Sequence, residues 1–180
     1  MPAYATRLAT LLLCAVAFAQ LVPARAEAGP TSAAPVPVIF RRVLPDIKSR
    51  TEVPILLPGT LPAAARVSEV RHSDGRADIA RYEVDLYGGA ALSNATFIGY
   101  LAGERKPQEQ GFGERVKLAD GKDGYFNAKS CGGSCSPSQV EWWREGILYT
   151  LQLRLDVKSP AEEKRGMIDA ANSAILGGPR

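Results

Sequence analysis

The clearest pattern of alternating apolar and polar residues lies near the C-terminus of the chain. Two runs, residues 139–144 and 147–157, are separated only by Glu145-Gly146, which predicts a tight β-hairpin. In that register Trp142 lies opposite Tyr149, and residues two apart share a face. The same face receives Val140, Leu151, Leu153, Leu155 and Val157. We expect this face to form part of the hydrophobic core.

The opposite face of the hairpin carries Trp143 and Leu148. One of the adjacent aromatic residues Tyr125 and Phe126 must also point outward, and with Tyr125 the three side chains form an apolar patch. Such a patch either binds a partner or is covered by another part of the chain. The two candidates for a cover are the C-terminal helix, argued below, and residues 39–44.

A second hairpin is predicted around Asp74-Gly75, a dipeptide that favours tight turns. Its strands are residues 67–72 and 77–86, and a two-residue turn places Val70 opposite Ile79. The apolar positions of the second strand change phase near its start. We therefore expect a β-bulge there.

Four further apolar runs are predicted to be strands: residues 53–57, 96–102, 114–119 and 125–129. Pro54 lacks a backbone N–H, which confines the first of these to a sheet edge or to the start of a strand. Residues 45–50 have proline at their first position, as short helices often do. We expect a short helix there.

The last element has the spacing of an amphipathic helix. Ser159 is a favourable N-cap, Pro160 suits the first helical position, and Glu162 completes a capping box. Gly177 is placed to end the helix. Its apolar face comprises Met167, Ile168, Ala171, Ala174 and Ile175. The predicted fold class is α+β, a single antiparallel β-sheet of about six to eight strands with the C-terminal helix packed on one face.

The N-terminus has the three-part pattern of a secretory signal peptide. Arg7 precedes an apolar run, residues 8–18, and Ala24-Arg25-Ala26 supplies a cleavage site. The apolar run is shorter than the ~20 residues of a transmembrane helix. We therefore expect an exported protein, periplasmic or extracellular, without a membrane span after cleavage.

Three parts are predicted: residues 1–26 form the signal peptide, residues 27–38 a flexible Ala/Pro-rich tether, and residues 39–180 a single α+β domain. The whole chain has a formal charge of +3, from 22 Lys and Arg against 19 Asp and Glu. Loss of Arg7 and Arg25 lowers this charge to +1. A near-neutral domain lacks the basic surface that binds a phosphate backbone, so no nucleic-acid partner is expected.

Cleavage also removes Cys14 and leaves Cys131 and Cys135. In an oxidising compartment these two are expected to form a disulfide that closes a short loop. A redox-active pair usually has two intervening residues at a helix N-terminus, whereas this pair has three and precedes a strand. A zinc site made from the two cysteines and His72 lacks a fourth ligand. No metal and no cofactor is therefore expected.

Several motifs follow one another in the second half of the chain: Gly124-Tyr125-Phe126, Cys131-Gly132-Gly133-Ser134-Cys135, Val140-Glu141-Trp142 and Glu145-Gly146-Ile147-Leu148-Tyr149-Thr150-Leu151. With a helix ending in Ala174-Ile175, this series resembles a family of small exported bacterial proteins of unknown function. The final part is also similar to a domain of unknown function in bacterial surface lipoproteins. Some members carry a further cysteine pair where this chain has Ser93-Asn94-Ala95-Thr96. The resemblance implies the fold and export. It supplies no known active site whose residues could be identified in this chain.

His72, the single histidine, is the natural starting point for a catalytic site. Its neighbours Ser73 and Asp74 cannot complete a triad, because triad residues meet through the fold rather than along one turn. A distant hydroxyl, such as that of Ser130 or Ser134, is left open. We predict no catalytic residue and expect His72 to be a solvated turn residue.

These observations favour a non-enzymatic exported binding or interaction module of the bacterial cell envelope, whose partner is an unidentified envelope protein or glycan. Trp143, Leu148 and Tyr125 are the predicted binding residues. The alternative is an envelope hydrolase that uses His72 with a sequence-distant Ser or carboxylate. A cleft that brings such a group to His72 favours the hydrolase, and an isolated, exposed His72 argues against it.

Overall fold

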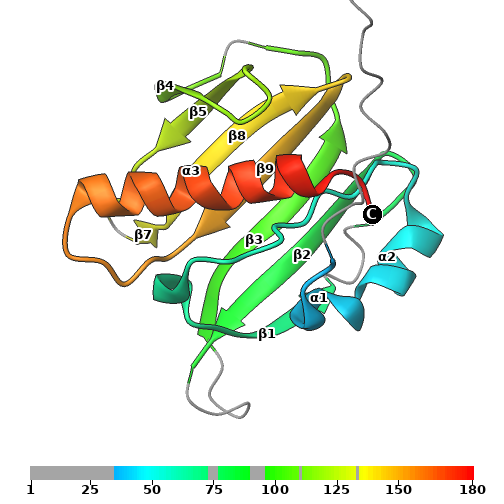
Figure 1. Cartoon of the computed structure of the whole chain (residues 1–180), viewed down its shortest axis with the longest axis horizontal. Helices are drawn as coiled ribbons and strands as arrows, with labels where there is room; N and C mark the ends of the chain where they lie inside the picture. Colours follow the sequence, from blue (N-terminus) through cyan, green and yellow to red (C-terminus); the bar gives the residue numbers. More distant parts are fainter. Residues whose placement is uncertain (1–34, 73–76, 90–95, 110, 133) are drawn as a thin grey trace, which may run out of the picture. The chain divides into compact units, whose positions relative to one another are not determined.

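The structure, a computed structural model, describes residues 35–72, 77–89, 96–109, 111–132 and 134–180. The predicted signal peptide, most of the predicted tether and the Asp74-Gly75 turn lie outside these residues. The described part consists of an antiparallel sheet with helices on one face (Figure 1). None of its helices is both long and apolar enough to cross a membrane.

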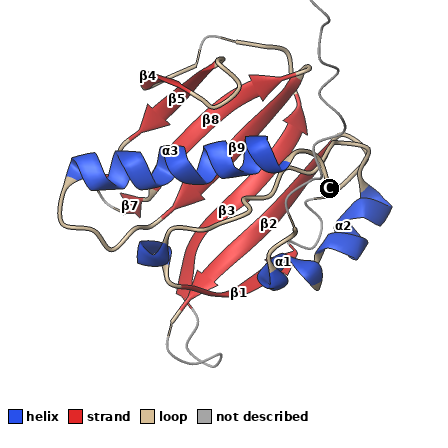
Figure 2. Cartoon of the chain, in the orientation of Figure 1, coloured by secondary structure: helices blue, strands red, loops and turns tan. Residues whose placement is uncertain are grey.

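Seven strands form the sheet in the order β1-β2-β3-β9-β8-β5-β4 (Figure 2). Their bounds are β1 (Val67–His72), β2 (Arg81–Gly88), β3 (Thr96–Arg105), β4 (Glu114–Lys117), β5 (Asp123–Asn127), β8 (Ser138–Arg144) and β9 (Ile147–Leu153). A separate two-stranded ladder pairs β6 (Ser130–Cys131) with β7 (Cys135–Ser136). The predicted α+β class and the single antiparallel sheet are confirmed.

The helices are α1 (Val38–Arg41), α2 (Leu44–Arg50) and α3 (Pro160–Gly177), with a 3₁₀ turn η1 (Ala63–Ala65). The start of α3 follows the prediction, because the Ser159 hydroxyl accepts a hydrogen bond from the Glu162 N–H at 3.3 Å. Its end comes one residue later than predicted. Gly178 is the C-cap and has a φ of 69°, which glycine adopts without a steric penalty.

The C-terminal hairpin has the predicted register. Trp142 pairs with Tyr149, and their rings stack with centroids 5.6 Å apart. The connecting residues Glu145 and Gly146 have φ values of 55° and 75°, the pair of positive angles that a type I′ turn requires. Val140 pairs with Leu151, and both side chains are fully buried.

Helix α3 crosses the inner face of the sheet, in front of β8 and β9 (Figure 1). Its buried side chains, among them Met167 and Ala171, share the core with Trp142 of the sheet. Phe40 of α1 and Ile47 of α2 are completely buried in the same core. The N-terminal and C-terminal helices therefore both contribute to the cover of the inner face.

A third part of this cover, residues 51–62, has no regular secondary structure, and we call it the crossing segment. Its apolar side chains are buried: Val53, Ile55, Leu56 and Leu57. The predicted strand at residues 53–57 is wrong, because the segment forms only an isolated bridge between Leu56 and Pro179. Residues 53–57 are apolar because they pack over the face of the sheet, not because they form one of its strands.

Side chains of the sheet replace the missing strand partner of the crossing segment. The Tyr82 hydroxyl accepts a hydrogen bond from the Leu56 N–H at 3.0 Å and donates one to the Leu56 carbonyl at 3.3 Å. The Tyr149 hydroxyl donates to the Pro54 carbonyl at 2.9 Å. Burial raises the pKa of both phenols, that of Tyr149 to about 12, so both hydroxyls keep their protons at neutral pH.

The pairing of β1 with β2 differs from the predicted hairpin. Val70 pairs with Leu86, not with Ile79, which is 62% exposed. Asp78 and Arg81 instead form an isolated β-bridge across a separate turn, so β2 begins only at Arg81. The shift in the alternation of apolar positions within residues 77–86 predicted a β-bulge. The shift arises instead because the first residues of that predicted strand belong to this turn.

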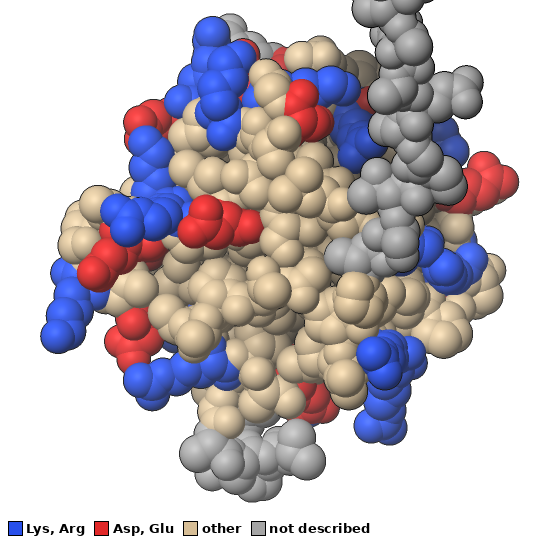
Figure 3. Space-filling model, viewed as in Figure 1, with Lys and Arg blue, Asp and Glu red and all other residues tan. Residues whose placement is uncertain are grey.

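Acidic and basic side chains are interspersed around the rim of the face seen in Figure 3. Several make ion pairs, such as Arg66 with Asp156 at 2.8 Å. Both partners of this pair are more than two-thirds exposed, with side-chain exposures of 77% and 70%. Exposed pairs of this kind contribute about 0–1 kcal/mol, so the fold depends on its core.

Replacement of Tyr82 by Phe tests the role of its hydroxyl. The substitution leaves the buried N–H and carbonyl of Leu56 without their partner, so the free energy of unfolding should fall by ~1–3 kcal/mol. Tyr149→Phe removes one hydrogen bond and should cost less. Urea denaturation measures both effects, with Tyr87→Phe on the opposite face as the control. A Tyr82→Phe variant as stable as the original protein contradicts this role.

Candidate functional site

The face of the sheet opposite α3, the open face, carries the three predicted binding residues. Tyr125 of β5, Trp143 of β8 and Leu148 of β9 are all half-buried there. Trp143 pairs with Leu148 as predicted. The rings of Tyr125 and Trp143 meet edge to face, with centroids 6.3 Å apart and an interplanar angle of 85°. The structure therefore brings all three side chains together as one aromatic patch.

Neither of the two predicted covers lies over this aromatic patch. Helix α3 and residues 39–44 belong to the core on the inner face, as does Trp142, and Trp143 points to the other side because side chains alternate along β8. A different segment, the connection between β3 and β4, approaches the patch. A Cβ atom at Gly111 would lie 2.2 Å from the Tyr125 ring, so only glycine permits this contact. The paired glycines around Phe112 are the sequence signal that could have indicated it.

A pocket of about 340 Å³ adjoins the aromatic patch. Tyr125 and Trp143 line it together with polar and charged neighbours: Gln108, Lys117, Lys122, Asp123, Glu145 and Gly146. The indole Nε1 of Trp143 is buried and has no hydrogen-bond partner among the described residues. The pocket thus combines two aromatic rings with a charged rim, an arrangement suited to a ligand with both apolar and polar surfaces.

The positive and negative charges on the rim of the pocket partly neutralise one another. Lys117 Nζ lies 2.7 Å from Asp123 Oδ1, and this ammonium lowers the pKa of the Asp123 carboxyl. The second ion pair of Asp123, with Arg115, is longer at 3.9 Å. Asp123 therefore stays ionised at neutral pH and presents an acceptor to the pocket.

Glu141 lies on the same open face, paired with Tyr125 across β5 and β8. Burial raises the pKa of its carboxyl, while the charge of Lys106 and a hydrogen bond with Gln139 act in the opposite direction. Gln139 in turn accepts a hydrogen bond from Gln152 at 3.3 Å. Half-buried polar side chains therefore lie next to the aromatic patch on the open face. No pattern in the sequence distinguished Glu141 from a solvated strand residue.

His72 is not the solvated turn residue that we expected. Its side chain is only 7% exposed and belongs to the inward-facing row of β1, two residues after Val70. His72 Nδ1 lies 2.8 Å from Oδ2 of Asp46 in α2, although the two groups are not aligned for a hydrogen bond. The other oxygen of Asp46 accepts from Arg50 at 3.1 Å. The turn prediction failed because it considered only the neighbours of His72 in the sequence.

Neither ring nitrogen of His72 has a hydrogen-bond partner in the described part of the chain. A hydrolase of the predicted type needs a nucleophile or a water-activating group in contact with the imidazole. Asp46 supplies a nearby carboxylate, which is one element of such a site. No hydroxyl or thiol among the described residues completes it.

Cys131 and Cys135 form the predicted disulfide. Both residues are exposed and belong to the small β6–β7 ladder, where the Gly132 N–H donates to the Ser134 carbonyl at 3.0 Å. The pair is therefore unavailable as metal ligands. No group of three or more His, Cys, Asp or Glu among the described residues is placed to hold a metal ion.

Comparisons of this chain with protein families, with curated proteins and with solved structures find no match. The similarity to small exported bacterial proteins therefore stays a prediction, and the argument for function depends on the geometry of the site.

The raised pKa of Glu141 predicts how Glu141→Gln changes stability with pH. A carboxyl whose pKa is higher in the folded state stabilises the fold below its unfolded pKa of about 4.3, and this contribution is lost as the pH rises through the folded pKa. Glu141→Gln should therefore raise the melting temperature at pH 7, and the gain should disappear below about pH 4. Thermal melts across this range measure it. Glu109→Gln in an exposed loop is the control, and a gain that is constant with pH contradicts the prediction.

Proposed function

We propose that this protein is a non-enzymatic binding module of the bacterial cell envelope, and that its ligand docks on the aromatic patch of the open face. The observation that carries the proposal is the Tyr125–Trp143 pair beside a pocket with a charged rim. Tryptophan and tyrosine supply large contact areas at binding sites, and a polar group at their edge fixes orientation.

The size and lining of the pocket favour a glycan over a protein as the ligand. Its volume of about 340 Å³ falls at the lower end of the range of ~300–1,000 Å³ for small-molecule sites. A sugar ring has C–H groups that pack on Trp143 and hydroxyls that hydrogen-bond with charged groups such as Asp123 and Lys122.

Two observations support export to the envelope. The N-terminal sequence matches the pattern of a cleavable signal peptide, with Ala24-Arg25-Ala26 at the expected site. The Cys131–Cys135 disulfide agrees with an oxidising compartment, where such bonds persist. A periplasmic or extracellular location follows from this part of the proposal.

Trp143→Ala tests the ligand site. Loss of a central tryptophan typically costs ~2 kcal/mol or more of binding energy, which corresponds to about a 30-fold weaker affinity. Calorimetric titration with soluble peptidoglycan fragments and envelope polysaccharides measures this change. The melting temperature should change little, because Trp143 lies outside the core.

The matched control is Phe97→Ala. Phe97 forms an edge-to-face pair with Tyr87, with centroids 5.9 Å apart, and is 41% exposed. This variant removes an aromatic ring from outside the proposed site and should bind like the original protein. Equal binding by Trp143→Ala and the original protein contradicts the site. Failure of the original protein to bind any of these glycans contradicts the ligand class.

The envelope hydrolase is the second candidate, because His72 lies 2.8 Å from Asp46. The two functions make opposite predictions for His72→Ala. A binding module should show no ester or amide hydrolysis above the level of buffer, and the variant should keep the affinity of the original protein for the glycan. If the original protein hydrolyses p-nitrophenyl esters and the His72→Ala variant does not, the protein is a hydrolase and the proposal of a binding module is wrong.

A further inference from the structure

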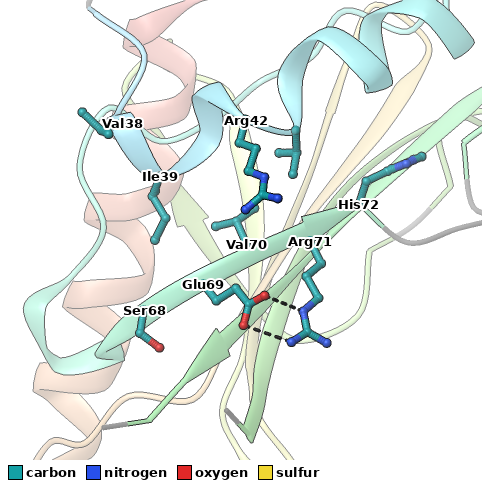
Figure 4. A pocket seen from close by; sticks show the side chains of 9 residues that line it. Val38, Ile39, Arg42, Ser68, Glu69, Val70, Arg71 and His72 are labelled. Carbon is teal, nitrogen blue, oxygen red and sulfur yellow. Dashed lines mark hydrogen bonds and ion pairs between the residues drawn. The ribbon is translucent and has the colours of Figure 1, made fainter. Parts of the chain in front are cut away.

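Strand β1 is one of the two edges of the sheet, and within the described residues its only strand partner is β2. A pocket of about 590 Å³ runs along its other side, between β1 and α1 (Figure 4). Five consecutive residues of β1, Ser68 to His72, line this pocket. Alternate side chains of a strand point to opposite faces, so a pocket that touches five in succession lies along the backbone edge.

The opposite edge of the sheet, β4, is shorter and more densely charged than β1, although β1 has a β-bulge of its own between Val67 and Glu69. β4 has four residues, and three of them are charged: Glu114, Arg115 and Lys117. Short length and a high density of charge are common means of preventing the addition of another strand. β1 has six residues, and its charged residues Glu69 and Arg71 have opposite signs.

The charges of β1 are arranged symmetrically about Val70. An antiparallel copy of the same strand, related by a two-fold axis at Val70, places Glu69 of each copy opposite Arg71 of the other. Ser68 then lies opposite His72, and the two Val70 residues face each other. An isologous interface requires this kind of self-complementary pattern.

Glu69 and Arg71 can pair either within one strand or between two copies. Glu69 and Arg71 are two residues apart on one strand, so their Cα atoms are separated by about 6.6 Å, whereas directly opposed residues of antiparallel strands lie about 4.5–5.5 Å apart. Within one chain Arg71 Nε already bonds Glu69 Oε1 at 2.7 Å, although the arginine side chain is 52% exposed. The same two groups can therefore exchange partners without a loss of charge pairing.

Helix α1 and its C-cap residue Arg42 form the other wall of this pocket, with apolar side chains and one positive charge that acts on Glu69. Val38 is 73% exposed, and Ile39 is half-buried beside it. In Figure 4 the Ile39 side chain and the guanidinium of Arg42 point toward β1, whereas the Val38 side chain points away from it. A strand added to β1 covers this wall as well as the free backbone groups.

We infer that β1 is the site at which two copies of this chain pair, edge to edge, to form one continuous antiparallel sheet. The two-fold axis passes between the Val70 residues, and the Glu69–Arg71 pairs form across the interface on the open face. In the described part of the chain each β1 has one edge without a strand partner, so the assembly closes at two copies.

Charge reversal tests this interface. Glu69→Arg places two like-charged pairs across the two-fold axis, and so does Arg71→Glu, so each variant should raise the dimer dissociation constant at least about tenfold. An equimolar mixture of the two variants restores both pairs and should form a heterodimer. Sedimentation equilibrium of the original protein, of each variant and of the mixture measures these states.

The control variants carry the same charge changes away from β1: Glu109→Arg in a loop and Arg115→Glu on the β4 edge. Both should dimerise like the original protein. Circular dichroism confirms that each charge-reversed variant is folded. A double variant, Glu69→Arg with Arg71→Glu, keeps the complementarity and should dimerise alone, but it should not mix with the original protein.

Amide hydrogen exchange locates the contact independently. The backbone N–H groups of residues 67–72 should exchange more slowly as the protein concentration rises, and those of β4 should not. An original protein that stays monomeric, or a mixture of the two variants that does not associate, overturns the inference. The inference is also overturned if the protein is a monomer whose β1 amides are protected from exchange only when a peptide is added. In that case the β1 edge binds a peptide strand rather than a second copy.

Discussion

Two tyrosine hydroxyls hold an irregular stretch of backbone against the sheet. Apolar side chains alone can cover a sheet from many positions, but buried N–H and carbonyl groups need defined partners. Tyr82 satisfies both polar groups of Leu56, and Tyr149 satisfies the Pro54 carbonyl. These bonds set where the crossing segment lies. The other parts of the cover attach to it: the Arg180 N–H donates to the Ile55 carbonyl, so the end of the chain follows the same path.

The register that places these tyrosines also creates the open face. Trp142 and Trp143 are neighbours, so one packs under α3 and the other joins the aromatic patch. A shift of β8 by one residue relative to β9 would exchange them and disrupt both the core and the site. The core and the candidate site are therefore two consequences of one pairing, between Trp142 and Tyr149. A substitution that weakens the hairpin affects both.

The parts of the structure that the sequence predicted depend on local patterns. The hairpin at Glu145-Gly146 and the capping of α3 by Ser159 are determined within a few residues. Residues 53–57 were assigned to a strand because an apolar run looks the same within a sheet and over it. The burial of His72 beside Asp46 depends on how α2 packs against β1, and no local pattern contains that contact. The aromatic patch was predicted from alternation, but the approach of Gly111 to Tyr125 was not.

The proposed binding site and the proposed dimer edge are compatible within one sheet. The strand order places β1 at one end, and Tyr125 and Trp143 lie on β5 and β8 toward the other. Antiparallel pairing of two β1 strands about an axis normal to the sheet keeps both open faces on the same side of the assembly. The dimer then presents two aromatic patches in one direction. A repetitive surface such as an envelope polysaccharide can engage both, and the second contact becomes intramolecular, which strengthens overall binding without any new interaction at either site.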